Sequence, residues 1–177
     1  TLTKGEPTVT GIEPVGDRTA DAVLALAAAA EASSEHPLAR AVTGAAAARD
    51  LDVTPAREFS SSPAVGVRAT VGGMVVEVGG PYLLDQRDQD ELPVAEQWRS
   101  EGAIILHVLA DGEVIGALRL ADAIRPESKA AVDALHVVGA QVVMITGDAQ
   151  AVAEDVAAEL GIDRVFAGVR PEDKAAK

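Results

Sequence analysis

The hydrophobic pattern of the first 50 residues predicts two helices joined by a short polar turn. An almost wholly apolar run at residues 20–32 predicts a helix that is covered on most sides. Residues 37–49 carry apolar side chains at helical spacing, which predicts a second helix with one buried face. A strand-like segment at residues 9–15 precedes both. The chain therefore opens with a strand and a helical hairpin.

The turn of this helical hairpin contains the tetrapeptide Ser34-Glu35-His36-Pro37. Proline suits the first position of a helix and disfavours helical backbone in the residue before it. We therefore expect His36 at the mouth of the second helix. Taken alone, the four residues favour an ordinary helix start in which Ser33 or Ser34 supplies the capping oxygen.

From residue 59 onward the hydrophobic period changes to two. Alternation at residues 65–71, a Gly-Gly turn and residues 74–78 predict a β-hairpin. A polar helix is expected at residues 90–101. Residues 103–109 and 113–120, on either side of an Asp-Gly turn, predict a second hairpin. Together these segments predict an antiparallel sheet with helices on one face.

The pattern changes again near residues 120–125, where we place a domain boundary. Downstream, the expected order is a helix at 124–138, a strand at 141–145, a helix at 149–160 and a strand at 164–166. This order is typical of parallel βαβ units. The predicted fold class is therefore α/β (α+β): an antiparallel sheet flanked by helices, followed by part of a parallel, Rossmann-like sheet.

The composition limits the chemistry that the chain can perform. Hydrophobic residues make up 48% of it but aromatic residues only 2%, so the core is expected to be aliphatic. A formal net charge of -13 disfavours nucleic acid and anionic membrane surfaces as partners. The absence of cysteine excludes disulfides, thiolate metal sites and a cysteine nucleophile. An anionic ligand would therefore need a local arrangement of donors.

Polar residues follow the predicted strand at residues 141–145. The turn Thr146-Gly147-Asp148 stands at the carboxyl end of that strand, where open α/β sheets bind ligands. A helix begins there, and its N-terminus suits phosphate. Lys174 follows the next strand and offers a positive charge. The alternative interpretations are that Asp148 is a helix cap and Lys174 a surface lysine.

Six segments, in this order along the chain, resemble the cytoplasmic loop of heavy-metal-transporting P-type ATPases. The segments are residues 1–7, 34–37, the hairpin around Gly66, 122–126, 146–148 and 171–174. The resemblance covers essentially the whole chain. Its most specific element is Ser-Glu-His-Pro, which points to the heavy-metal class rather than to calcium, sodium or potassium pumps.

The resemblance implies a domain organisation. Residues 1–8 would be a linker after the phosphorylated-aspartate motif, 9–120 the nucleotide-binding domain and 121–177 part of a haloacid-dehalogenase-type phosphorylation domain. The phosphorylated aspartate is expected just upstream of Thr1, and a motif that helps to hold Mg²⁺ beyond Lys177. We therefore expect the chain to bind ATP or ADP, with Mg²⁺ accompanying ATP, without appreciable turnover by itself.

The resemblance also implies a nucleotide pocket. Its residues are Glu31, His36, Ala64, Gly66, Val67, Gly79 and Gly80. His36 is expected to stack on or hydrogen-bond the adenine, and Glu31 to lie near the exocyclic amine. The glycines of the family pattern would let backbone approach the nucleotide. Here Ala64 replaces a glycine and Gly80 an asparagine, and alanine lacks easy access to positive φ, so we expect an altered nucleotide affinity.

In the phosphorylation part, the resemblance assigns three roles. Thr146 would contact the transferring phosphoryl group, Lys174 would neutralise it and Asp148 would shape the site. No residue of the chain is assigned as a metal ligand. His107 and His136 match nothing functional in the family and are expected to be structural or exposed.

The implied parent is an ATP-driven metal-ion translocase of the cell membrane. This region would be monomeric, on the cytoplasmic side, beside actuator and membrane domains. Copper is the ion expected first, although zinc, cadmium and cobalt pumps share the motifs.

Two alternatives stay open. A haloacid-dehalogenase-like phosphatase would need an N-terminal Asp-x-Asp strand, and a regulatory module without nucleotide affinity is favoured by Ala64 and Gly80.

Overall fold

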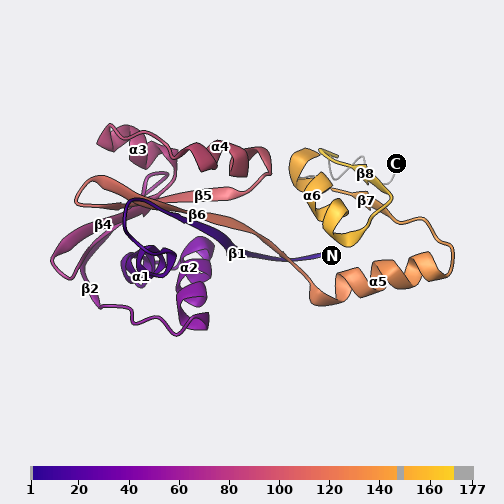
Figure 1. The fold of residues 1–177 in the computed structure, drawn as a ribbon, viewed down its shortest axis with the longest axis horizontal. Helices are drawn as coiled ribbons and strands as arrows, with labels where there is room; N and C mark the ends of the chain where they lie inside the picture. Colours follow the sequence, from indigo (N-terminus) through magenta and orange to yellow (C-terminus); the bar gives the residue numbers. More distant parts are fainter. Residues whose placement is uncertain (1, 147–149, 170–177) are drawn as a thin grey trace. The chain divides into compact units, whose positions relative to one another are not determined.

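The computed structural model describes residues 2–146 and 150–169. They form two compact units, which Figure 1 draws in one ribbon. The larger unit consists of residues 6–99 and 104–121. The smaller unit is made from the described parts of residues 1–5, 100–103 and 122–177.

A six-stranded antiparallel sheet forms the centre of the larger unit, in the order β1-β6-β5-β4-β3-β2. Its strands are β1 (Thr3–Pro14), β2 (Ala56–Ser62), β3 (Gly66–Val71), β4 (Met74–Gly79), β5 (Ile104–Ala110) and β6 (Glu113–Ile124). Both predicted hairpins, β3–β4 and β5–β6, are confirmed. Strand β2 pairs with β3 and forms the edge of the sheet beside the first hairpin. The alternating pattern had not predicted this strand.

Helices cover both faces of this sheet (Figure 1). Helices α1 (Ala20–Glu31) and α2 (Pro37–Ala48) lie on one face, and α3 (Pro81–Arg87) and α4 (Pro93–Ser100) on the other. In β5, Leu106 and Val108 pack into the α1/α2 core, whereas Leu109 packs with α3. The expectation of helices on one face was therefore wrong. The apolar run of β5 indicates a strand that is buried on both sides.

The α1/α2 face has an aliphatic core built from small side chains. In α1, Val23, Leu24 and residues 27–30 are all buried. Thr19 caps this helix, since its Oγ1 accepts a hydrogen bond from the backbone N–H of Ala22 at 3.1 Å. Alanines at the interface let α1 and α2 lie close together and against β3 and β4. The predicted aliphatic core is confirmed.

The smaller unit contains α5 (Pro126–Val137), β7 (Val143–Ile145), α6 (Gln150–Leu160) and β8 (Arg164–Phe166). Strands β7 and β8 pair in parallel, as the sequence predicted. Among the helices of the described ranges, none has the length and apolar character needed to cross a membrane.

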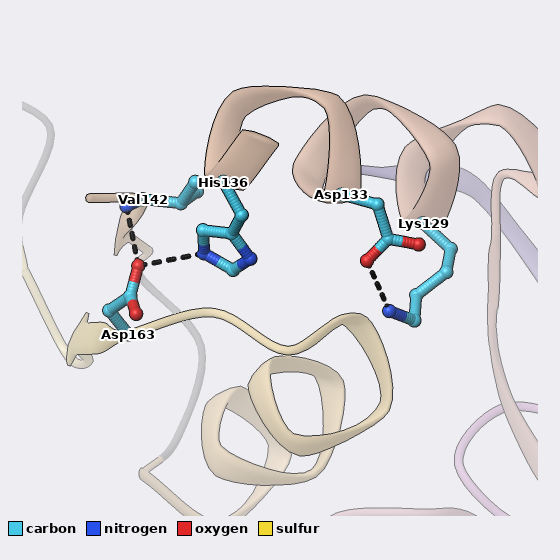
Figure 2. Close-up of polar contacts among 5 residues, drawn as sticks. All are labelled: Lys129, Asp133, His136, Val142 and Asp163. Atoms are coloured by element: carbon cyan, nitrogen blue, oxygen red, sulfur yellow. Dashed lines mark hydrogen bonds and ion pairs between the residues drawn. The ribbon is translucent and has the colours of Figure 1, made fainter. Parts of the chain in front are cut away.

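One carboxylate holds three parts of the smaller unit together (Figure 2). Asp163 Oδ2 accepts a hydrogen bond from the backbone N–H of Val142 at 2.7 Å and lies 2.9 Å from His136 Nε2. The backbone hydrogen bond and the histidine contact lower the pKa of Asp163. His136, in the last turn of α5, therefore has a structural role that links α5 to the segment before β8.

Candidate functional site

A cavity of about 770 Å³ lies in the larger unit, between the α1–α2 turn and the β3–β4 hairpin. Its wall includes all seven residues that the sequence analysis placed in a nucleotide pocket: Glu31, His36, Ala64, Gly66, Val67, Gly79 and Gly80. Residues that are distant in the sequence thus share one wall. The remaining wall contains the acidic residue Glu35, serines and apolar residues. Such a mixed, concave surface suits a small organic ligand.

Glu31 brings a buried carboxylate to this cavity. It is the last residue of α1 and only 6% exposed. Burial raises the pKa of Glu31, and a hydrogen bond with the Ser34 side chain partly opposes this. Among the described residues, no hydrogen-bond partner reaches its Oε2. A buried acceptor without a partner is unfavourable, so this atom is suited to an N–H donor of a ligand.

His36 lies at the start of α2 and is itself the helix cap. Its backbone is extended, with φ -64° and ψ 144°, and its Nδ1 accepts a hydrogen bond from the backbone N–H of Leu38 at 3.2 Å. The expected cap from a serine was wrong, because Ser34 Oγ accepts from the His36 N–H, outside the helix. Since Nδ1 acts as an acceptor, the neutral ring carries its proton on Nε2. That Nε2–H is a donor for the cavity.

Two glycines of the cavity wall face each other across β3 and β4. Gly66 pairs with Gly79 in the sheet register. A Cβ on Gly66 would lie 2.1 Å from the backbone oxygen of Val78, and one on Gly79 would lie 2.0 Å from the backbone oxygen of Val65. Packing within the hairpin therefore requires glycine at both positions, which the sequence pattern did not reveal. Their lack of a side chain lets the two backbones approach each other.

The two departures from the family pattern have different structural consequences. Ala64 adopts positive φ (63°) despite its Cβ, at a cost of about 1 kcal/mol. The conformation that glycine would favour is therefore retained. Gly80 precedes α3 and provides no side-chain cap, and a Cβ there would meet nothing within 4 Å. The space for a larger residue is present at Gly80.

The predicted phosphoryl-site residues are only partly described. Thr146 follows β7, where its backbone N–H donates to Phe166 O and its carbonyl accepts from Val169 N–H, both at 2.9 Å. It lines a second cavity, of about 430 Å³, within the smaller unit. Asp148 and Lys174 lie outside the described residues.

A polar cluster beneath α4 was not foreseen from the sequence. His107 on β5 is fully buried, and its Nε2 lies 3.1 Å from Glu91 Oε1, which also pairs with Arg99. Burial lowers the pKa of His107, although the Glu91 carboxylate opposes this shift. A strand pattern alone cannot show that a carboxylate 16 positions away covers this ring. The cluster holds α4 on the sheet, away from the wall of the larger cavity.

No metal centre is formed by the residues that the structure describes, because they contain no group of three or more histidine or acidic side chains that could hold an ion.

A family model described as haloacid dehalogenase-like hydrolase matches residues 1–177. "Copper-transporting ATPase 1" of Rhizobium meliloti is 39% identical over 177 residues, which cover 98% of this chain and 21% of that relative. The chain thus spans about a fifth of that protein.

Solved structures of P-type ATPases are among those similar to the chain. A zinc-transporting PIB-type ATPase matches with a TM-score of 0.88 and 30% identity, over 99% of this chain and 29% of that one. The N-domain of HMA8, a copper-transporting P-type ATPase, matches with a TM-score of 0.54 and 27% identity, over 63% of this chain and 97% of that one.

Proposed function

Because the chain belongs to the haloacid dehalogenase-like hydrolases and, within them, to the nucleotide-binding and catalytic region of PIB-type heavy-metal P-type ATPases, we propose that its larger cavity binds the adenine of ATP. The observation that carries this proposal is the unpartnered Oε2 of Glu31, which is buried in the wall that also contains His36. A ligand that brings an N–H donor to Glu31 would remove an unfavourable buried group.

Adenine has the complementary pattern of donors and acceptors. Its exocyclic amine donates to the Glu31 carboxylate, and a ring nitrogen accepts the hydrogen bond from His36 Nε2–H. Guanine carries a carbonyl oxygen where adenine carries the amine. This oxygen would face the Glu31 carboxylate, and both groups are hydrogen-bond acceptors. The cavity is therefore expected to prefer ATP or ADP over the guanine nucleotides. Gly66, Gly79, Gly80, Val67 and Ala64 supply the neighbouring wall.

The phosphates belong to a second part of the proposal. Thr146 contacts the transferring phosphoryl group, with Asp148 shaping and Lys174 neutralising that site, and Mg²⁺ arrives with ATP. The acceptor is an aspartate that precedes Thr1 in the longer protein. Residues 1–8, 9–120 and 121–177 are the linker, the nucleotide-binding domain and the partial phosphorylation domain. Alone, the chain binds ATP without appreciable turnover.

The longer protein is an ATP-driven pump for a heavy-metal cation, with copper as the first choice because of the copper-transporting relative. In it, this region works on the cytoplasmic side of the membrane, as a monomer, together with actuator and membrane domains.

The test is titration calorimetry with ATP and GTP on the wild-type chain and on Glu31→Met. Methionine keeps the length of the side chain but removes the acceptor. We expect ATP affinity to fall about tenfold, the cost of one hydrogen bond, and the preference for ATP over GTP to disappear. The thermal midpoint is expected to stay or rise, because a charged group with an unfavourable burial has been removed.

Failure of the wild-type chain to bind ATP would contradict the proposal and favour a regulatory module without nucleotide affinity. An unchanged preference for ATP in folded Glu31→Met would contradict the role of Glu31. Steady phosphatase activity of the chain by itself, abolished by a change at Thr146, would support the alternative hydrolase.

A further inference from the structure

Strand β2 contains a bulge directly beside the cavity. In its pairing with β3, Arg57 lies opposite Thr70 and Ser60 opposite Arg68. Two residues of β2, Glu58 and Phe59, therefore stand against a single residue of β3. Such two-against-one insertions are β-bulges, which commonly occur next to functional sites and change the direction of side chains.

The bulge decides which residues of β2 face the α1/α2 side of the sheet. Ala56 lies opposite Val71 and Ser61 opposite Val67, and both of these β3 residues belong to the core on that side. In a regular strand, residues five positions apart would point to opposite faces. With the extra residue, both ends of β2 face the same side. Phe59, two positions from Ser61, shares its face and lines the cavity.

The conformation that produces the bulge is unfavourable for its residue. Glu58 has φ 54°, a left-handed backbone that is usually occupied by glycine at this position of a bulge. Its Oε2 accepts a hydrogen bond from Thr70 Oγ1 at 2.8 Å, which holds the bulge against β3. Backbone strain that is kept by a specific contact is frequent where it positions a side chain for binding.

The side chain positioned in this way is aromatic. The chain has four aromatic residues, all within the described ranges, and only Phe59 lines the larger cavity. Its side chain lies on an edge strand and is 37% exposed, so the ring is accessible to a ligand. An apolar ring in the same wall as Glu31 and His36 offers a flat face to a flat ligand.

Resting on the proposed binding of adenine nucleotides, we infer that Phe59 stacks on the adenine base and that the Glu58–Thr70 bulge is the device that holds it there. Glu31 and His36 would read the edge of the base, and Phe59 would contact its face. Base stacking on an aromatic side chain requires no particular base, so Phe59 adds affinity whereas Glu31 supplies the preference for adenine.

The experiment compares Phe59→Leu with a matched control, Tyr82→Leu, which removes an exposed aromatic ring from α3 outside the cavity wall. Calorimetry with ATP and with adenosine is expected to show about a tenfold weaker affinity for both ligands in Phe59→Leu and no change in Tyr82→Leu. In proton NMR spectra, the adenine H2 and H8 signals are expected to shift upfield on binding to wild type, and less so in Phe59→Leu.

A further pair of variants tests the bulge. Glu58→Gly loses the hydrogen bond with Thr70 but adopts the left-handed backbone without strain, so the bulge is kept and the affinity should stay near the wild-type value. Glu58→Pro excludes this backbone and should lose affinity as Phe59→Leu does. Circular dichroism and urea unfolding of each variant show whether it is folded.

Equal ATP affinity and equal NMR shifts in folded Phe59→Leu and wild type would overturn the inference while leaving the adenine proposal intact; the bulge would then serve only to protect an edge strand. Absence of ATP binding in wild type would remove both proposals together.

Discussion

His36 Nδ1 accepts a hydrogen bond from the backbone N–H of Leu38, so the residue with the proposed ligand contact is also the cap of α2. The proposed contact would give the same imidazole a second role through its other ring nitrogen. Its Nδ1 stabilises the helix start, and its Nε2 would donate to the ligand. A simple alanine substitution would remove both functions, and binding and folding effects would be mixed.

A pair of substitutions separates these functions. Asparagine is among the best capping residues, so His36→Asn is expected to keep the stability of the chain, whereas His36→Ala loses about 1 kcal/mol of unfolding free energy. Both should lose about tenfold in ATP affinity, because neither offers the imidazole Nε2–H. Urea unfolding and calorimetry measure the two effects. Wild-type affinity in His36→Asn would contradict the assignment of the ring to adenine.

The paired glycines of β3 and β4 predict a sharp contrast between neighbouring positions. Gly79→Ala places a Cβ about 2.0 Å from Val65 O, so the hairpin must separate, and we expect a loss of about 3 kcal/mol or more in unfolding free energy. Gly80→Ala, one residue further, meets nothing within 4 Å and should change stability by less than about 1 kcal/mol. Urea unfolding compares them, and similar losses for both would contradict the close approach.

The buried His107 predicts a dependence of stability on pH. Burial lowers the pKa of His107 in the folded chain, so the unfolded chain takes up this proton more readily. The stabilisation is therefore present above the ordinary histidine pKa of about 6.5 and is lost as the pH falls below it, by at most about 1.4 kcal/mol per pH unit. The pKa of Glu91 is lowered chiefly by Arg99, so the titration of Glu91 affects stability only at more acidic pH.

Urea unfolding between about pH 7.5 and pH 5.5 tests this in wild type and in His107→Gln, which lacks the titrating ring. The wild-type chain should lose more unfolding free energy over this range than His107→Gln does. His136→Gln serves as the histidine control and should keep the slope due to His107. Equal slopes in wild type and His107→Gln would show that this ring does not contribute.

Much of the fold follows from the hydrophobic pattern because most elements bury one regular face. The β3–β4 and β5–β6 hairpins and the order of elements in the smaller unit are as predicted. The hydrophobic pattern did not predict the arrangement where an element is buried on both faces. Every residue of β5 from Ile105 to Ala110 is buried, so its sequence does not show that α3 and α4 cover the second face.

The candidate site was less accessible to sequence reasoning. The residues Glu31 and His36 were identified by resemblance, and the structure places them in one cavity wall. The cap of α2 was assigned to the wrong residue type, because an imidazole nitrogen and a serine oxygen can both accept a hydrogen bond. Phe59 was missed, because the bulge that directs it depends on the pairing of β2 with β3 and on the backbone of Glu58.

Gly66, Gly79 and Gly80 contribute only main chain to the wall of the cavity. These positions have no rotamers, so the shape of the wall there depends on how β3 and β4 are aligned. Substitutions elsewhere in the sheet would then alter ligand selectivity only by moving wall residues that carry side chains, or by shifting the whole β3–β4 hairpin. If the cavity binds adenine as proposed, engineering of a different base preference would begin with Glu31 on α1, not on the glycine-rich strands.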